Sequence, residues 1–314
     1  MPIISIIIPL FNKELFIKQT LLSVLNQTFS DFEIIIINDG STDNSVSIIN
    51  DLDDKRITLY TTKNKGVSHA RNYGISKANS DLIALLDADD LWDSNHLDNL
   101  YSLYTSFPKC GLYATNYYKQ FFNGRKINTH FNGVSKDHFG IIEDYFSAST
   151  IDSIAWTSAV MIPKKTFMSI GEFDEEMRSG QDTDLWIRIA LEASVAFSAV
   201  ASAHKIILDP QFHLSYSSNR MDRLKLFKNF KEVEISNSSF KKYMDLNRFS
   251  VALERKIAGD FKSYKGLKKE INLENLNFKQ RLLLKTPSVF IKLLKQLQNV
   301  MLRYNIYLSP FKKW

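Results

Sequence analysis

The stretch Leu82-Ile83-Ala84-Leu85-Leu86-Asp87-Ala88-Asp89-Asp90 joins a run of apolar residues to three carboxylates. An apolar run without polar alternation is typical of a strand that is covered on both faces, as in a parallel sheet. Clustered carboxylates repel one another and are costly to bury, so the end of this strand needs a positive partner. A hard divalent cation, Mn²⁺ or Mg²⁺, prefers carboxylate oxygen and often brings a phosphorylated substrate. Taken alone, the segment could instead be a solvated acidic turn that caps the next helix.

Apolar runs and helical spacings alternate before this stretch. Such alternation predicts an α/β fold with a Rossmann-like, mostly parallel central sheet flanked by helices. Ligands of these sheets bind beyond the carboxyl ends of the strands, where Asn12, Asp39 and the acidic cluster fall. Strands are expected at 3–9, 34–37, 57–60 and 82–86, and helices from Asn12 to Leu25, at 46–52 and at 67–78.

The middle of the chain is predicted to extend the sheet, and the last third is predicted to be helical. Residues 123–140 are rich in Asn, Gly, His and Lys, which indicates a flexible loop. We expect helices at 94–107 and 183–193, and strands at 112–118 and 157–162. The predicted domains are 1–110 and 111–219, which are the two halves of the α/β domain, and 220–314, a basic helical C-terminal extension.

The composition is that of a soluble globular protein, with 44% hydrophobic and 24% charged residues among 314. A single cysteine, Cys110, excludes an intramolecular disulfide and favours a reducing compartment. The N-terminus lacks the features of a signal peptide, and no apolar run reaches the roughly 18 residues that span a bilayer. We therefore expect a cytoplasmic protein.

Basic residues are concentrated near the C-terminus, where residues 221–314 contain 21 Lys/Arg and 8 Asp/Glu. Such a balance indicates an anionic partner, either nucleic acid or lipid headgroups. No zinc finger or ribonucleoprotein motif accompanies it, so we expect lipid and no nucleic acid.

The segment Gly66-Val67-Ser68-His69-Ala70-Arg71-Asn72-Tyr73-Gly74 opens a predicted helix. Backbone N–H groups at a helix N-terminus suit an anion, and Arg71 could add a bidentate contact. Alternatively, Arg71 pairs with an aspartate at the edge of the sheet.

Five segments in this order and spacing resemble the inverting family 2 glycosyltransferases of the GT-A fold, of the bacterial O-antigen and capsule type. The resemblance extends from residue 3 to about 218. The segments are Ser5 to Asn12, Asn38-Asp39-Gly40-Ser41-Thr42-Asp43, Gly66 to Gly74, Asp87-Ala88-Asp89-Asp90, and Gly180-Gln181-Asp182-Thr183-Asp184-Leu185-Trp186-Ile187-Arg188.

The resemblance implies a UDP-sugar donor, bound in the half that spans 1–110. Pro9 and Asn12 would line the nucleotide pocket, Asp39 would bind the nucleobase, and Arg71 would contact the nucleotide. Asp87 would contact the ribose or the sugar.

The same resemblance implies a divalent metal ion, Mn²⁺ or Mg²⁺. Asp89 would bind the metal, Asp90 would support it from behind, and His213 is a candidate further ligand. His213 lies in a segment similar to the family's closing motif, although Gln211 and Phe212 replace its usual Tyr-Arg. A structural role for His213 stays open.

On the acceptor side, in the half 111–219, Asp182 matches the general base of the family. Gln181 replaces the usual glutamate and could still form hydrogen bonds with an acceptor sugar. Trp186 could stack on that sugar or belong to the core. Asp184, early in a helix, has an ordinary structural explanation.

An apolar stripe with helical spacing occupies the basic C-terminal extension. It could lie on an anionic membrane surface or pack on the catalytic domain. Its members are Leu283, Phe290, Leu294, Leu297, Met301 and Tyr304.

The predicted function is metal-dependent, inverting transfer of a hexose, glucose or galactose, from a UDP-sugar. The expected acceptor is a polyprenyl-diphosphate-linked saccharide such as GlcNAc-diphosphoundecaprenol, at the inner face of the cell membrane. One alternative is a haloacid-dehalogenase-like phosphohydrolase, whose strand-Asp-x-Asp motif fits Asp87 and Asp89 but leaves Asp39 and Asp182 unexplained. A catalytically inactive sugar-nucleotide binding module is another.

Overall fold

The computed structural model describes residues 1–121, 124–207, 223–303 and 310–311, apart from the side chains of Asn299, Leu302 and Arg303. The chain forms two compact units. The predicted halves 1–110 and 111–219 fall mainly in the first unit, and the boundary between them stays a prediction. The first unit comprises Met1–His130, Val134–Tyr145 and Ile154–Asp222, and the second comprises Phe131–Gly133, Phe146–Ser153 and Arg223–Trp314.

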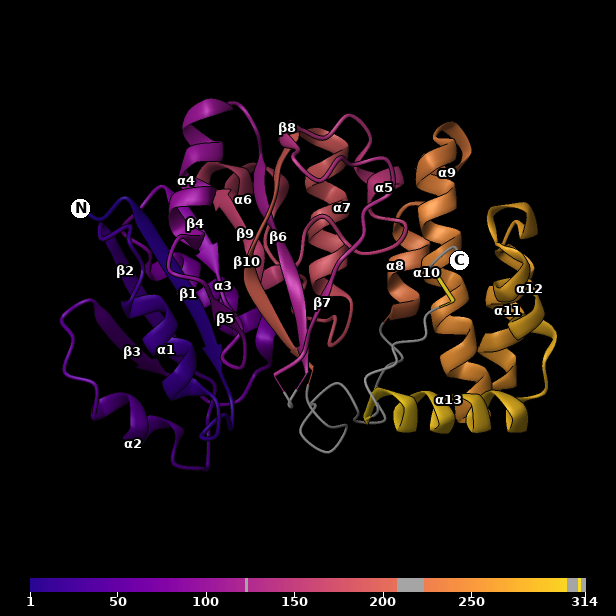
Figure 1. Ribbon diagram of the computed structural model, residues 1–314, viewed down its shortest axis with the longest axis horizontal. Coiled ribbons are helices and arrows are strands. Elements are labelled where there is room, and N and C mark those ends of the chain that lie inside the picture. The colour runs from indigo at the N-terminus through magenta and orange to yellow at the C-terminus, as the bar shows by residue number, and fades with distance from the viewer. Residues whose placement is uncertain (122–123, 208–222, 304–309, 312–314) are drawn as a thin grey trace. The chain divides into compact units, whose positions relative to one another are not determined.

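The first unit begins with the predicted alternation of strands and helices (Figure 1). Strands β3, β2, β1 and β4 lie side by side in that order and are all parallel. The strands β1, β2 and β4 are almost wholly buried, and in β1 only Pro9 is partly exposed, whereas every residue of the edge strand β3 is at least partly exposed. The elements are β1 (Ile4–Leu10), α1 (Ile17–Leu25), β2 (Phe32–Asn38), α2 (Ser45–Asn50), β3 (Ile57–Thr61), α3 (Val67–Lys77) and β4 (Leu82–Leu85).

The rest of the first unit continues the same sheet beyond β4. The complete order is β3-β2-β1-β4-β9-β6-β10-β5, with β7 paired to β6 and β8 paired to β10. Strand β9 is antiparallel to both of its neighbours, whereas β6 and β10 are parallel. The elements are β5 (Leu91–Trp92), α4 (His96–Ser106), β6 (Leu112–Phe121), β7 (Lys126–Asn128), β8 (Phe139–Ile141), η1 (Thr157–Ala159), β9 (Val160–Pro163), α6 (Lys164–Ile170), α7 (Gln181–Glu192) and β10 (Val195–Ile207). The short helix α5 (Tyr145–Ala148) follows β8, and its residues 146–148 belong to the second unit.

The mostly parallel α/β sheet confirms the predicted fold class, with differences in its second half. The loop predicted at 123–140 contains the short strands β7 and β8, which are held by pairing with the longer β6 and β10. The strand predicted from residue 157 begins with the 3₁₀ turn η1, so extended pairing starts at residue 160.

Helix α3 lies very close to the sheet because Gly74 has no side chain. A Cβ atom at this position would be 2.5 Å from Cγ2 of Ile7 and 3.2 Å from Cγ1 of Ile37. The close approach fixes the position of α3 against β1 and β2, and with it the loop that precedes the helix.

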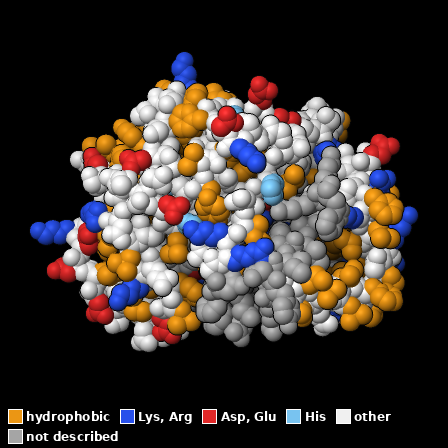
Figure 2. All heavy atoms as spheres, in the orientation of Figure 1, with side chains coloured by type: hydrophobic (Ala, Val, Ile, Leu, Met, Phe, Trp, Pro, Cys, Tyr) orange, Lys and Arg blue, Asp and Glu red, His pale blue; other side chains and the backbone are white. Residues whose placement is uncertain are grey.

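The second unit is helical, as predicted for the C-terminal extension. Its long helix α10 buries Phe240, Met244 and Phe249, together with the charged pair Arg248 and Asp245. No helix within the described ranges is long and apolar enough to cross a membrane. Figure 2 shows hydrophobic side chains gathered on the surface where Figure 1 draws α13. The elements are α8 (Arg223–Asn229), α9 (Lys231–Ser236), α10 (Ser238–Ala258), α11 (Phe261–Glu270), η5 (Leu273–Asn275), α12 (Phe278–Lys285) and α13 (Ser288–Arg303).

Candidate active site

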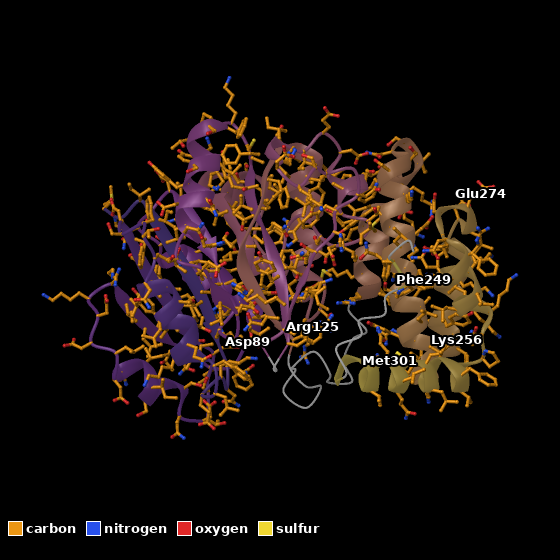
Figure 3. All side chains as sticks on the ribbon, viewed as in Figure 1. Asp89, Arg125, Phe249, Lys256, Glu274 and Met301 are labelled. Atoms are coloured by element: carbon orange, nitrogen blue, oxygen red, sulfur yellow. The ribbon has the colours of Figure 1, made fainter. Side chains whose placement is uncertain are left out.

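The acidic loop Asp87–Asp90 follows β4 at the carboxyl end of the parallel strands, the edge at which such sheets bind ligands. Its members differ in exposure. The side chains of Asp87 and Asp89 are 31% and 19% exposed, whereas Asp90 is buried. Figure 3 labels Asp89, which lies near the ends of the strands. Two carboxylates of the loop are thus accessible to a ligand and the third is not.

Ser158, in η1, holds the acidic loop in place. Its hydroxyl accepts a hydrogen bond from the backbone N–H of Asp87 at 3.1 Å and donates one to Asp90 at 2.6 Å. The second carboxylate oxygen of Asp90 accepts from the backbone N–H of Ile206 at 3.0 Å. Burial, and then the charges of Asp89 and Asp87, raise the pKa of Asp90 well above its ordinary value. These contacts hold Asp90 inside the loop, and its expected support of a metal ion stays a prediction.

Each accessible carboxylate has a basic partner. Asp89 forms an ion pair with Lys13, and Asp87 forms one with Arg71 at 2.6 Å. The structure therefore confirms the predicted alternative in which Arg71 pairs with an aspartate at the edge of the sheet. The guanidinium lies 5.2 Å from the ring centroid of Phe173, and its Nε and Nη1 are buried with no hydrogen-bond acceptor among the described residues. Arg71 thus still has N–H groups to offer a ligand.

Asp39 is buried at the end of β2 and holds the loop that leads into α3. Its carboxylate accepts hydrogen bonds from the backbone N–H groups of Lys65 (2.9 Å) and Gly66 (2.8 Å) and from the hydroxyl of Thr62 (3.2 Å). Gly66 has φ 97°, a backbone conformation that suits glycine. Because a carboxylate offers about four acceptor sites, about one remains for a ligand.

Asn12 connects the loops that follow β1 and β2. Its side-chain oxygen accepts from the backbone N–H of Thr42 at 2.8 Å, and its own N–H donates to the hydroxyl of Ser41 at 3.0 Å. Asn12 has φ 50°, which asparagine tolerates better than most residues. Pro9 lies in β1 just before this loop and is partly exposed. Asp43 accepts from the backbone N–H of Ser45 at 3.0 Å, a local structural contact at the start of α2.

The predicted acceptor-side residues lie at the start of α7. Asp182 is partly exposed, and one of its carboxylate oxygens accepts local hydrogen bonds from the backbone N–H of Thr183 at 2.7 Å and from the hydroxyl of Thr183 at 3.4 Å. Gln181 is buried, and its side-chain oxygen has no donor within the described parts of the chain. Asp184 accepts from Nε of Arg188 at 2.8 Å, and Arg188 also donates to backbone oxygens of residues 170–172. Asp184 therefore has the structural role.

Trp186 does not have the exposure that sugar stacking requires. It is only 2% exposed and makes an edge-to-face contact with Phe173, with ring centroids 6.1 Å apart. A ring without an open face cannot receive a sugar, so the structure favours the core role and does not support the predicted acceptor contact.

The donor set of the site fits a hard divalent cation that is shared with a substrate. Asp87 and Asp89 supply carboxylate oxygen, and Mg²⁺ typically binds through one or two carboxylates together with substrate phosphates. No group of three or more metal-binding side chains occurs among the residues that the structure describes. His213 lies outside the described residues.

One family model matches the part of the chain that contains most of this candidate site. Residues 5–170 match the family model described as Glycosyl transferase family 2, which is more than half of the 314 residues. The chain belongs to glycosyl transferase family 2. The matched part of this glycosyltransferase contains Asn12, Asp39, Arg71 and the acidic loop. The phosphohydrolase alternative is therefore wrong.

Other glycosyltransferases match parts of the chain. An uncharacterized glycosyltransferase of Haemophilus influenzae is 46% identical over 101 residues, 31% of this chain and 40% of that protein. Glycosyltransferase GlyA of Streptococcus pneumoniae is 29% identical over 163 residues, 50% of this chain and 23% of that protein. The matches span well under two thirds of the length of these relatives.

Solved structures share the fold of this glycosyltransferase. The structure of S. aureus TarS 1-349 in complex with UDP-GlcNAc has a TM-score of 0.59 at 17% identity, covering 74% of this chain and 66% of that one. TarS 1-349 alone has a TM-score of 0.57 and covers 85% of this chain and 90% of that one. The likeness confirms the expected GT-A type of fold.

Two residues of the site were not anticipated from the sequence. Lys13 pairs with Asp89 and directly follows Asn12, the last residue of the first motif. This position next to a motif was a signal from which Lys13 could have been predicted. Ser158 carries no such signal, because it is 71 residues from Asp87 and lies in no motif.

Proposed function

We propose that this glycosyltransferase moves a hexose, glucose or galactose, from a UDP-sugar to a lipid-diphosphate-linked saccharide with inversion at the anomeric carbon. A bacterial surface polysaccharide, O-antigen or capsule, would be the product, and GlcNAc-diphosphoundecaprenol is a specific candidate acceptor. The observation that carries the proposal is the pair of accessible carboxylates, Asp87 and Asp89, each with a cationic partner at the ligand-binding edge of the sheet. TarS, which shares the fold, was solved with UDP-GlcNAc, and this supports a UDP-sugar as donor.

In this proposal the nucleotide is bound by groups that the fold leaves available. Asp39 uses its remaining acceptor site for an N–H of the nucleobase, and the free Nε and Nη1 of Arg71 donate to the nucleotide. Pro9 and Asn12 form the wall of the pocket at the end of β1. Asp87 accepts from hydroxyls of the ribose or the transferred sugar.

Asp89 would hold Mn²⁺ or Mg²⁺, with His213 as a second candidate ligand. When bound, such an ion supplies positive charge that stabilises the departing nucleoside diphosphate. Asp90 and Ser158 keep the loop in the conformation that presents Asp89.

Inverting transfer proceeds by one in-line displacement and requires one general base. Asp182 takes the proton of the acceptor hydroxyl, since its carboxylate is partly exposed and lightly hydrogen-bonded. As the hydroxyl oxygen bonds to the anomeric carbon, the bond from that carbon to the diphosphate breaks and UDP leaves. Gln181 orients the acceptor through its unpartnered side-chain oxygen.

A lipid-linked acceptor requires the enzyme to work at the inner, cytoplasmic face of the cell membrane. The excess of basic residues over 221–314 supports an anionic membrane surface as the partner of the C-terminal helices.

A transfer assay tests the reaction. The enzyme is incubated with Mn²⁺, a synthetic lipid-diphosphate GlcNAc acceptor and, in turn, radiolabelled UDP-Glc, UDP-Gal, UDP-GlcNAc and UDP-GalNAc. We expect Asp182→Asn and Asp89→Ala each to lower kcat by about 100-fold or more, since a positioned base alone contributes this much. Asp53→Asn, at an exposed carboxylate before β3, is the matched control and should leave kcat unchanged.

Transfer that survives both Asp182→Asn and Asp89→Ala would refute the mechanism. No transfer from any of the four donors by the wild-type enzyme, despite binding of UDP-sugar, would favour an inactive binding module instead.

A further inference from the structure

Helix α13 exposes its apolar side chains to solvent. Six of them are 48–64% exposed, whereas Ile291 on the same helix is 4% exposed. Figure 2 shows the resulting hydrophobic patch where Figure 1 draws the helix. We call these six residues the apolar face of α13: Val289, Phe290, Leu293, Leu294, Leu297 and Val300.

The apolar face is wide and continuous. At about 100° per residue, its six members fall within an arc of about 140° of the helix circumference. The helix instead turns Ile291, with the partly exposed Lys295 and Gln298, away from this arc. A surface helix of a globular protein normally directs its apolar stripe toward the core, so the orientation of α13 is reversed. Exposed apolar patches of this kind mark interaction sites.

The sequence that contains this face carries charges of a single sign. Residues 275–314 contain eight Lys/Arg and no Asp/Glu. Lys292 is exposed on α13 beside the arc, and Arg281 and Lys285 are exposed on α12. Helix α12 also exposes Phe278 and Leu282, one turn apart. Basic and apolar groups are therefore presented together.

The positive charge of residues 275–314 favours one of two partners for the apolar face, a second copy of the chain or a lipid bilayer. A second copy would place the same patch against itself in a two-fold dimer and bring like charges together. An anionic bilayer instead neutralises the lysines in its headgroup layer while it buries the leucines beneath. The helix has 16 residues, about 24 Å at 1.5 Å per residue, and is not apolar enough to cross the membrane.

We propose that α13 lies in the plane of an anionic lipid bilayer, with its apolar face in the boundary between headgroups and acyl chains. Lys285 and Lys292 contact the anionic headgroups. The inference rests on the proposed function for its purpose, since it would bring the enzyme to a lipid-linked acceptor, but the binding itself needs neither donor nor acceptor.

Flotation of the full chain with lipid vesicles tests the inference. We expect at least about tenfold more protein on mixed phosphatidylcholine–phosphatidylglycerol vesicles than on phosphatidylcholine alone, and less at high salt. The double variant Leu293→Gln and Leu297→Gln keeps the charge and should lower partitioning by about tenfold or more. Its matched control is Gln296→Ala, an exposed neighbour outside the arc, which should bind as the wild type does.

Charge is tested with a second pair of variants. Lys285→Gln with Lys292→Gln should lower binding to the mixed vesicles about tenfold. Lys265→Gln with Lys269→Gln removes the same charge from exposed positions of α11 and should have a smaller effect.

Three outcomes would overturn the inference: no preference for anionic vesicles, equal binding by the double leucine variant, or a wild-type dimer that this variant splits while vesicles are ignored. Light scattering detects the dimer. Transfer to a short-chain, water-soluble acceptor is measured separately, so retained transfer without vesicle binding would overturn this inference and leave the proposed reaction standing.

Discussion

The ammonium group of Lys13 lies against Asp89, the carboxylate to which we assign the metal ion. Both side chains are mostly buried, with 12% and 19% exposure, so the pair is partly shielded from solvent. A divalent cation at Asp89 would be repelled by this ammonium group. We therefore expect Lys13 to compete with a metal ion for Asp89.

Lys13→Gln should bind Mn²⁺ about three- to tenfold more tightly than the wild type in the absence of donor, because the competing ion pair is gone. Titration calorimetry with MnCl₂ gives the dissociation constants. Lys18→Gln, at an exposed lysine of α1, removes the same charge and should leave the affinity within twofold of the wild type. A weaker or unchanged affinity in Lys13→Gln would refute the competition.

At the scale of single residues, the sequence predicts the carboxylates of the candidate site but not the residues that hold them in place or pair with them. Asp87 and Asp89 are recognisable because three carboxylates after an apolar run require an explanation. Ser158 and Lys13 are not, since a hydroxyl or an ammonium group acquires its partner only when distant segments meet. From the sequence, Trp186 could stack on an acceptor sugar or belong to the core, and only its burial in the structure decides for the core.

Among the elements, α3 carries Arg71 and follows the loop that Asp39 holds. The distance between α3 and the sheet therefore sets where these two residues lie, to which we assign the nucleotide. That distance depends on Gly74, because an added Cβ there would collide with the side chain of Ile7 in β1 and crowd that of Ile37 in β2. Gly266 is a useful contrast, because it lies in α11 with no atom within 4 Å of an added Cβ.

Gly74→Ala should lower the free energy of unfolding by about 1–3 kcal/mol, because the new methyl group would overlap Ile7 and push the helix from the sheet. Gly266→Ala adds the same methyl group in open space and should raise it by about 0.5–1 kcal/mol. Urea denaturation of both variants measures the difference. Equal effects of the two substitutions would refute the close-packing argument.

The strands and helices of the first half follow the predicted ranges closely, because each shows a strong apolar period. The second half is less regular. Strand β10 was not predicted, since its Ala- and Ser-rich sequence lacks a clear alternation, yet it pairs with β6 along most of its length. The strands β7 and β8 have three residues each and depend on their partners.

For the molecule as a whole, the buried His96 makes stability depend on pH. His96 stacks on Trp92, and its Nδ1 lies 2.9 Å from the hydroxyl of Ser202. Burial, and then the charge of His204, lower the pKa of His96 to about 3 from an ordinary value of 6.5. The folded protein keeps this ring neutral while the unfolded chain protonates it below pH 6.5. The stability contribution is therefore complete above pH 6.5 and is lost as the pH falls toward 3.

Between pH 7 and 5, His96 should account for about 2 kcal/mol of lost stability. Glutamine at position 96 does not titrate. When the pH is lowered from 7 to 5, the free energy of unfolding should therefore fall by about 2 kcal/mol less in His96→Gln than in the wild type. Urea denaturation at both pH values gives the two differences. Asp90, with its raised pKa, acts in the opposite direction, but it is present in both proteins and cancels in the comparison. Parallel pH profiles of wild type and variant would contradict the assignment.

The sequence by itself determined the fold class, the family and the acidic loop, because periodic apolar runs and clustered charges are local properties of a chain. Tertiary structure decided which charges are paired, which aspartate is buried, and that Trp186 belongs to the core. It also decided which arc of α13 is exposed, a choice that the amphipathic pattern leaves open. These are properties of contacts between distant segments, and no local pattern encodes which surfaces meet.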